Sequence, residues 1–439
     1  MTAATDQVRP SLFDRVFGLE RHEYAAVAWS FLYFFCVLSA YYILRPVREM
    51  LGVQSGPETL PYLFMASFVV MLVATPVFGW ITSRYPRKVF LPWVYAFFIL
   101  NILAFWAASA YLVDEDQSRV WAGRIFFVWL SVFNLYVVSV FWSFMADIYT
   151  REQGRRLFGL LSSGGSIGAL LGSTTSFALA QNLGSQNLFP IAAILLTLAI
   201  LCIRQLRRWV MQEDHQQPGH RVEMGASLGG NALAGAKLAT SSNYFRAIVA
   251  ASIIASLLGT ALYLFRAYMV EASIADDDAQ TRFFAAINLA QNFFTILGQM
   301  FLVRFVVRRF GLGAALSIMP TLSVLCFVWV AADPSLLVIA IVDVIRRASG
   351  FTFSKPSTDM LYSVVTPEEK YKAKNFIDTT VYRFGDVVGI FLIRSMLTLG
   401  FSAVALIMLP FAVAWILIVN WLGRDYRRRA RDLRDKGLT

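Results

Sequence analysis

Several ionisable side chains lie inside long apolar segments, and the densest group falls between residues 336 and 365. This segment holds Asp343, Arg346, Arg347, Lys355 and Asp359. A charge at the centre of a membrane-spanning helix costs about 2.5–3.5 kcal/mol, so five charges facing lipid would cost on the order of 12–18 kcal/mol. They must therefore face partner groups or a water-filled cavity. The spacing predicts two i,i+4 ion pairs, Asp343 with Arg347 and Lys355 with Asp359.

Other apolar segments carry further charges. Asp378, Tyr382 and Asp386 recur every four residues, which places them on one helix face, and Arg383 lies beside them. The remaining charges lie nearer to segment ends, and they are Arg45, Arg48, Glu49, Arg124, Asp147, Arg266, Glu271 and Arg394. At the middle and outer depths of these segments, arginines outnumber carboxylates. Because guanidinium groups bind phosphate and carboxylate bidentately, this excess predicts a cationic cavity for an organic anion.

We assign two roles to these residues. The residues expected to bind the anion are Arg346, Arg347, Arg383, Arg45, Arg48, Arg124, Arg266, Tyr382 and Lys355. The residues expected to couple or gate transport are Asp147, Asp343, Asp359, Asp378, Asp386 and Glu49. The alternative is that the charges form internal salt bridges that gate two halves of the molecule without touching a substrate.

Other site chemistries lack candidate residues. The three histidines lie in polar segments, and the three cysteines fall in apolar runs as small hydrophobes. No Cys/His cluster indicates a metal, and no Ser/His/Asp arrangement indicates covalent catalysis. We therefore expect no enzyme activity, no cofactor and no metal.

The elements that carry these residues are predicted to be membrane-spanning helices. The chain is 57% hydrophobic and 15% charged, whereas soluble domains carry about 25% charged residues. Since about 20 apolar residues span a bilayer core, we predict an all-α polytopic membrane protein with twelve spans. The predicted spans are Tyr24–Leu44, Leu60–Ile81, Phe90–Tyr111, Ile125–Ala146, Leu157–Ala180, Leu188–Ile203, Ile248–Val270, Phe283–Val303, Leu312–Ala332, Leu336–Val365, Phe376–Leu399 and Phe401–Leu422.

The spans divide into two sets of six, separated by a polar stretch. Parallel six-span halves with a site between them are the plan of major facilitator transporters. The predicted domains are therefore an N-terminal bundle over 24–203, a linker over 204–245 and a C-terminal bundle over 246–422, flanked by a terminus over 1–23 and a basic tail over 423–439.

The net charge of +11 reflects the predicted membrane topology. Most Lys and Arg residues lie at alternate ends of the apolar runs, and cytoplasmic loops are enriched in these residues. We therefore expect a multi-pass protein of a bacterial inner membrane, with both termini cytoplasmic, surrounded by lipid, monomeric and without a nucleic-acid partner.

The two predicted halves echo each other in sequence. Phe141 precedes Asp147 by six residues, as Phe353 precedes Asp359. The pair Gly168 and Gly172 follows the first of these motifs, and Gly385 and Gly389 follow the second. With Gly164, the first pair forms a stripe of small residues, which favours close helix packing.

Four stretches give the chain a family resemblance. Residues 42–49, YILRPVRE, and 141–147, FWSFMAD, resemble motifs of the first half of the plastid and bacterial ADP/ATP translocase family. Residues 356–362, PSTDMLY, and 372–385 resemble motifs of its second half, with Thr358 at the family's lysine. The resemblance implies a twelve-helix exchanger of nucleotides with a basic cavity, and it implies functional charges at Arg45 and Asp147.

These observations lead to one expected function and two alternatives. We expect a secondary transporter that exchanges an organic anion, such as a nucleotide or a phosphorylated metabolite, by alternating access. The first alternative is a proton-coupled exporter of drugs or siderophore-like compounds, with Asp343, Asp378 or Asp386 carrying the proton. The second is a membrane sensor with a transporter-like body.

Overall fold

The computed structural model describes residues 20–84, 87–111, 116–216, 237–366, 369, 373–374 and 376–435. Every regular element in these ranges is helical, as the composition predicts. The predicted terminus up to residue 19, linker residues 217–236 and residues 436–439 lie outside the described residues.

Six long helices form the N-terminal half. They are α2 (Tyr24–Gln54), α3 (Leu60–Arg84), α4 (Arg87–Tyr111), α5 (Asp116–Ile148), α6 (Arg151–Leu183) and α7 (Leu188–Gln216). Each covers one predicted span and extends beyond it at one end or both. Helix α7 passes the predicted end at Ile203, because no Gly or Pro interrupts the polar residues that follow.

The C-terminal half repeats this plan with interrupted helices. Its elements are α9 (Asn243–Ser273), α10 (Asp277–Leu297), α11 (Val303–Ala332), α12 (Leu336–Ser349), α13 (Lys355–Leu361), α15 (Tyr382–Met396) and α16 (Phe401–Asp435). Three π-helical turns lie at Gly298–Leu302, Gly350–Ser354 and Ile377–Val381. The chain bends inside α11 at Gly311, whose φ of +82° favours glycine. The described part of the predicted basic tail, up to Asp435, continues α16 as a helix.

Nine helical stretches among the described residues are long and apolar enough to cross a membrane, and one of them, Asp277–Ala332, covers two predicted spans. The charged tenth and eleventh predicted spans are not among the nine. In the structure, the tenth span consists of α12, the π turn Gly350–Ser354 and α13. The eleventh span includes the π turn Ile377–Val381 and α15. The charges that make these two segments poor membrane helices belong to residues that are predicted to bind the anion or to gate transport.

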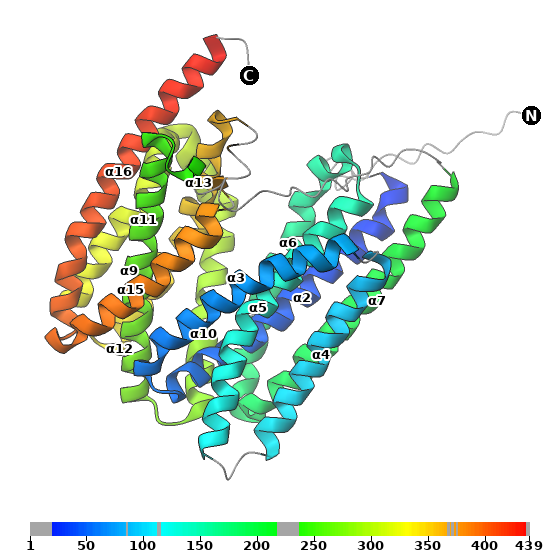
Figure 1. The fold of residues 1–439 in the computed structure, drawn as a ribbon, viewed down its shortest axis with the longest axis horizontal. Coiled ribbons are helices and arrows are strands. Elements are labelled where there is room, and N and C mark those ends of the chain that lie inside the picture. Colours follow the sequence, from blue (N-terminus) through cyan, green and yellow to red (C-terminus); the bar gives the residue numbers. More distant parts are fainter. Residues whose placement is uncertain are drawn as a thin grey trace, which may run out of the picture.

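The two halves lean against each other at one end and diverge at the other (Figure 1). We call the joined end the closed end and the other, where α2 begins and α16 ends, the open end. Polar contacts join the halves at the closed end: Arg119 with Asp277 at 2.9 Å, the Ser185 amide with Asp278 at 2.7 Å, Arg282 with Gln181, and Arg394 with Glu58 at 3.5 Å.

Small residues let paired helices approach closely in both halves. A Cβ atom on Gly164 would lie 2.7 Å from the carbonyl oxygen of Phe31 on α2, and Gly168 and Gly172 of α6 contact α2 in the same way. In the second half, Gly385 and Gly389 of α15 pack against α9. The predicted role of the glycine stripe in helix packing is confirmed, and in each half it joins the fifth span to the first.

We predict that Gly168→Ala lowers thermal stability, because the added Cβ meets the backbone of α2 rather than a movable side chain. Overpacking of this kind costs about 1–3 kcal/mol. Gly159→Ala, on an open face of the same helix, is the matched control and should be neutral or stabilising, since Ala exceeds Gly in helix propensity. Thermal unfolding of both variants in detergent measures the effect, and equal melting temperatures would contradict it.

Candidate functional site

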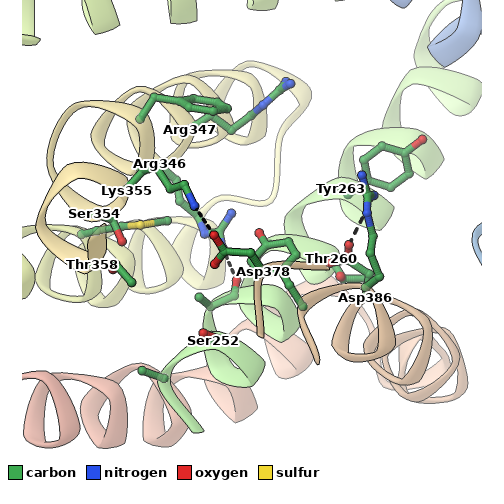
Figure 2. Close-up of a pocket in the computed structure, with 18 of the residues that line it drawn as sticks. Ser252, Thr260, Tyr263, Arg346, Arg347, Ser354, Lys355, Thr358, Asp378 and Asp386 are labelled. Atoms are coloured by element: carbon green, nitrogen blue, oxygen red, sulfur yellow. Dashed lines mark hydrogen bonds and ion pairs between the residues drawn. The ribbon is translucent and has the colours of Figure 1, made fainter. Parts of the chain in front are cut away.

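A cavity of about 540 Å³ lies between the two halves. Most residues expected to bind or gate line it: Arg45, Arg48, Glu49, Arg266, Asp343, Arg346, Arg347, Lys355, Asp378, Tyr382, Arg383 and Asp386. Arg346, Arg347 and Lys355 come from one helical segment, α12 to α13 (Figure 2), and Arg346 contacts the Ala255 carbonyl oxygen of α9. The seven basic side chains in this wall outnumber the four acidic ones, so the cavity is net cationic, as predicted.

A buried ion network closes the cavity toward the closed end. Arg266 of α9 contacts Asp343 of α12 and lies 3.2 Å from Glu49 of α2. Arg347 lies 3.3 Å from Asp343, and Arg48 lies 3.4 Å from Glu49. The side chains of Arg266, Glu49 and Asp343 are all less than 9% exposed. Because Glu49 belongs to the first half and Arg266 to the second, this network is a buried ionic link between the halves.

Two arginines of the cavity have no carboxylate partner within the described part of the chain. Arg346 is 6% exposed; its Nη2 donates to the carbonyl oxygen of Ala255, and its Nε has no partner. Arg45 packs near the ring of Tyr42, with 5.5 Å between the guanidinium carbon and the ring centre. An uncompensated buried cation is costly unless water or an anion reaches it. The cavity supplies access to both.

A second ion cluster lies toward the open end. Lys355 is 2.6 Å from Asp378 and 3.6 Å from Asp359, and Lys374 is 2.9 Å from Asp359. These side chains are about a third to a half exposed, so solvent screens their attraction. The i,i+4 pairs predicted for Lys355 with Asp359 and for Asp343 with Arg347 both form.

The carboxylate of Asp386 occupies the middle of the α9–α15 wall. It accepts a hydrogen bond from the Ser256 hydroxyl at 2.6 Å, and one of its oxygens lies 3.7 Å from Arg383. Arg383 is 43% exposed in the same pair. Its guanidinium is therefore held loosely beside the cavity.

Three predicted site residues do not line the cavity. Arg124 lies on α5 near the closed end, where it stacks 4.9 Å from Trp121 and contacts the carbonyl of Ser55. Asp147 lies at the other end of α5, and Asp359 points to the lysines of the open end. The position of a charge along a predicted span does not fix which side of the helix the residue occupies.

Neutral polar residues of the cavity were not predicted. Ser252, Thr260 and Tyr263 lie on α9 and line the wall, and Ser354 and Thr358 line it on the α12–α13 side (Figure 2). A signal for α9 was present in the sequence, since residues 252, 256 and 260 are hydroxyl-bearing at four-residue spacing. Single hydroxyl groups are common in membrane helices, so only the stripe is informative.

Comparisons with known proteins bear on both fold and family. A sequence model of the TLC ATP/ADP transporter family matches residues 116–426. ADP,ATP carrier protein 2 of Chlamydia pneumoniae is 31% identical over 96 residues, which are 20% of this chain and 18% of that carrier. The matched stretch thus spans less than a fifth of the curated relative.

Solved structures resemble nearly the whole chain. A POT family transporter in complex with a thioalcohol-conjugated peptide gives a TM-score of 0.62 at 12% identity, covering 91% of this chain and 96% of that one. A bacterial homologue of the iron transporter ferroportin, in an inward-facing state, gives 0.60 at 13% identity, covering 92% and 98%. These likenesses confirm the predicted all-helical, major-facilitator-like fold.

We predict that Asp343→Asn destabilises the protein strongly, because it leaves Arg266 and Arg347 without their shared carboxylate. Breaking a buried ion pair costs about 3–5 kcal/mol. Asp378→Asn is the control, since its pair with Lys355 is partly exposed and such pairs contribute about 0–1 kcal/mol. Thermal shift in detergent compares the two variants. A larger loss in the Asp378 variant would show that the network at the closed end is not the stabilising one.

Proposed function

The chain belongs to the TLC ATP/ADP transporter family, and from this premise we propose that it exchanges a nucleotide or another phosphorylated organic anion across a membrane. One observation carries the proposal: the buried guanidinium of Arg346 lies in the cavity wall with no carboxylate partner in the described chain. An anionic substrate would provide the counter-charge that the protein does not.

The size and lining of the cavity support an anion of this kind. Its volume of about 540 Å³ falls within the range of about 300–1,000 Å³ that is usual for small-molecule sites. The three-charge excess of basic over acidic side chains favours a polyanion such as a phosphorylated compound. Phe64, Tyr263 and Trp415 also line the cavity and offer aromatic faces to a planar base.

The ionic link between the halves provides a basis for exchange rather than free flow. Glu49 and Arg266 hold the two halves together where the cavity meets the closed end. A phosphate or carboxylate entering from the open end competes with Glu49 for the guanidinium of Arg266. The empty carrier therefore stays locked, whereas the loaded carrier can separate its halves at the closed end, and each crossing requires bound substrate.

The setting of the protein follows from the same premise. We propose a bacterial inner membrane with both termini cytoplasmic, so that the open end of the cavity faces the cytoplasm. We propose that the transporter works as a monomer, since the cavity is formed within one chain. Neither an enzymatic reaction nor a nucleic-acid partner is part of the proposal. The family match favours exchange over the proton-coupled exporter and the sensor.

We predict that Arg346→Gln lowers exchange of labelled ADP, or of the best stabilising anion in a thermal-shift screen, in proteoliposomes. Loss of charge-assisted hydrogen bonds worth about 1.5–3 kcal/mol corresponds to a decrease of about 10- to 100-fold. Arg309→Gln is the control, since Arg309 is exposed and does not line the cavity. Wild-type exchange by a well-folded Arg346→Gln variant would refute the proposed role.

We predict that Glu49→Gln converts exchange into leak, because the link from Glu49 to Arg266 loses its charge. Efflux of preloaded label from proteoliposomes should then proceed without external substrate, whereas the wild type requires it. Glu58→Gln removes an exposed contact between the halves and should leave the requirement intact. Strict exchange by the Glu49 variant would show that this link does not control the transition.

A further inference from the structure

The guanidinium of Arg346 packs against a position of α9 that has no side chain. A Cβ atom built on Gly259 would lie 2.8 Å from both Nη1 and Nη2 of Arg346 and 3.1 Å from its Cζ. Two of these distances are shorter than real Cβ contacts show. Any residue other than glycine at position 259 would therefore displace the guanidinium from its present place.

The same helix face anchors the group by a hydrogen bond. Ala255 lies one helical turn before Gly259, and its carbonyl oxygen accepts a hydrogen bond from Nη2 of Arg346. Both residues line the cavity. We call Ala255, Gly259 and the contact they make with Arg346 the arginine shelf. The shelf fixes the fork of Arg346 by one steric contact and one hydrogen bond.

The anchor leaves most of the fork unused. A guanidinium has five N–H donors. Among the described residues, the side chain of Arg346 donates one hydrogen bond, to the carbonyl oxygen of Ala255. The Nε group is buried without a partner. A planar fork with free donors matches two oxygens of one phosphate or carboxylate group.

We propose that Gly259 is a positioning residue: it holds the Arg346 fork so that the free donors meet a phosphate or carboxylate group of the substrate bidentately. This inference rests on the proposed function, because it assigns a specific orientation to a residue proposed to bind the anion. It predicts that the shelf determines affinity for the anionic group and leaves the structural transitions of the carrier unchanged.

The variant Gly259→Ala tests the shelf. Because the atoms that the new Cβ would meet are the far end of a long side chain, Arg346 moves and the fold is retained. The Michaelis constant for exchange of the anion should rise about tenfold or more, as expected for the loss of a bidentate charged contact, whereas the maximal rate changes little. Gly313→Ala, where the added Cβ would make only an ordinary van der Waals contact at 3.7 Å, should leave both parameters unchanged.

A double-variant cycle with Arg346→Lys separates positioning from general damage. Lysine keeps the charge but has no planar fork, so the single variant should also raise the Michaelis constant. If Gly259 acts through the fork, adding Gly259→Ala to Arg346→Lys has no further effect, and the two substitutions are strongly non-additive. Full additivity, or an unchanged Michaelis constant in Gly259→Ala, overturns the inference.

A thermal-shift screen distinguishes failure of the arginine shelf from failure of the proposed function. Wild-type protein is first screened by thermal shift with ADP, glucose 6-phosphate, inorganic phosphate and citrate, because a bound ligand stabilises the folded state. Stabilisation of the wild type together with equal binding by Gly259→Ala refutes the shelf alone. If no anion stabilises the wild type and no exchange occurs, the proposed function fails and the inference fails with it.

Discussion

The cost of holding a charge away from water governs this structure. Arg266, Asp343 and Glu49 are nearly inaccessible, and each is tolerated because the others neutralise it. The link also reaches from α9 and α12 to α2, because Arg266 is shared between Asp343 of its own half and Glu49 of the other half. Shape and electrostatics are therefore coupled, because the halves meet around this buried charge cluster at the closed end.

The arrangement of partners divides the cavity by function. Toward the closed end the charges are buried and mutually satisfied, whereas toward the open end Lys355, Asp378 and Asp359 are paired in a partly solvated setting. Arg346 lies between these clusters, is 6% exposed, and forms no ion pair with a carboxylate among the residues that the structure describes. An incoming anion would therefore pass a screened cluster before it reaches the least compensated cation, which gives the site a direction of approach.

Sequence reasoning succeeded where local spacing determines geometry. The Asp343–Arg347 and Lys355–Asp359 pairs follow from a four-residue step on one helix, and the glycine stripe of α6 follows from its period. The partnership of Glu49 with Arg266 could not be predicted, since it joins residues of different halves and depends on how the bundles tilt. Arg124 and Asp147 of α5 are not among the residues that line the cavity. Their side of the helix could not be predicted, because most of α5 is apolar and the pattern of apolar residues does not mark one face. The functional roles of these residues stay predictions.

The π-helical turn at Gly350–Ser354 determines which side of the tenth span carries the side chains of the following helix, α13. In an uninterrupted α-helix, each residue advances about 100°, so Lys355 would lie about 80° around the axis from Arg347. A π turn accommodates about one residue more than an α turn, which rotates the following residues back and brings Lys355 onto the side of Arg347; both line the cavity. The turn thus places Lys355 and Arg347 on the same side of the span. A chain of the same length that passed through this point as a regular α-helix would retain the same charges but would turn its lysine about 80° around the helix axis from Arg347, away from the aqueous path.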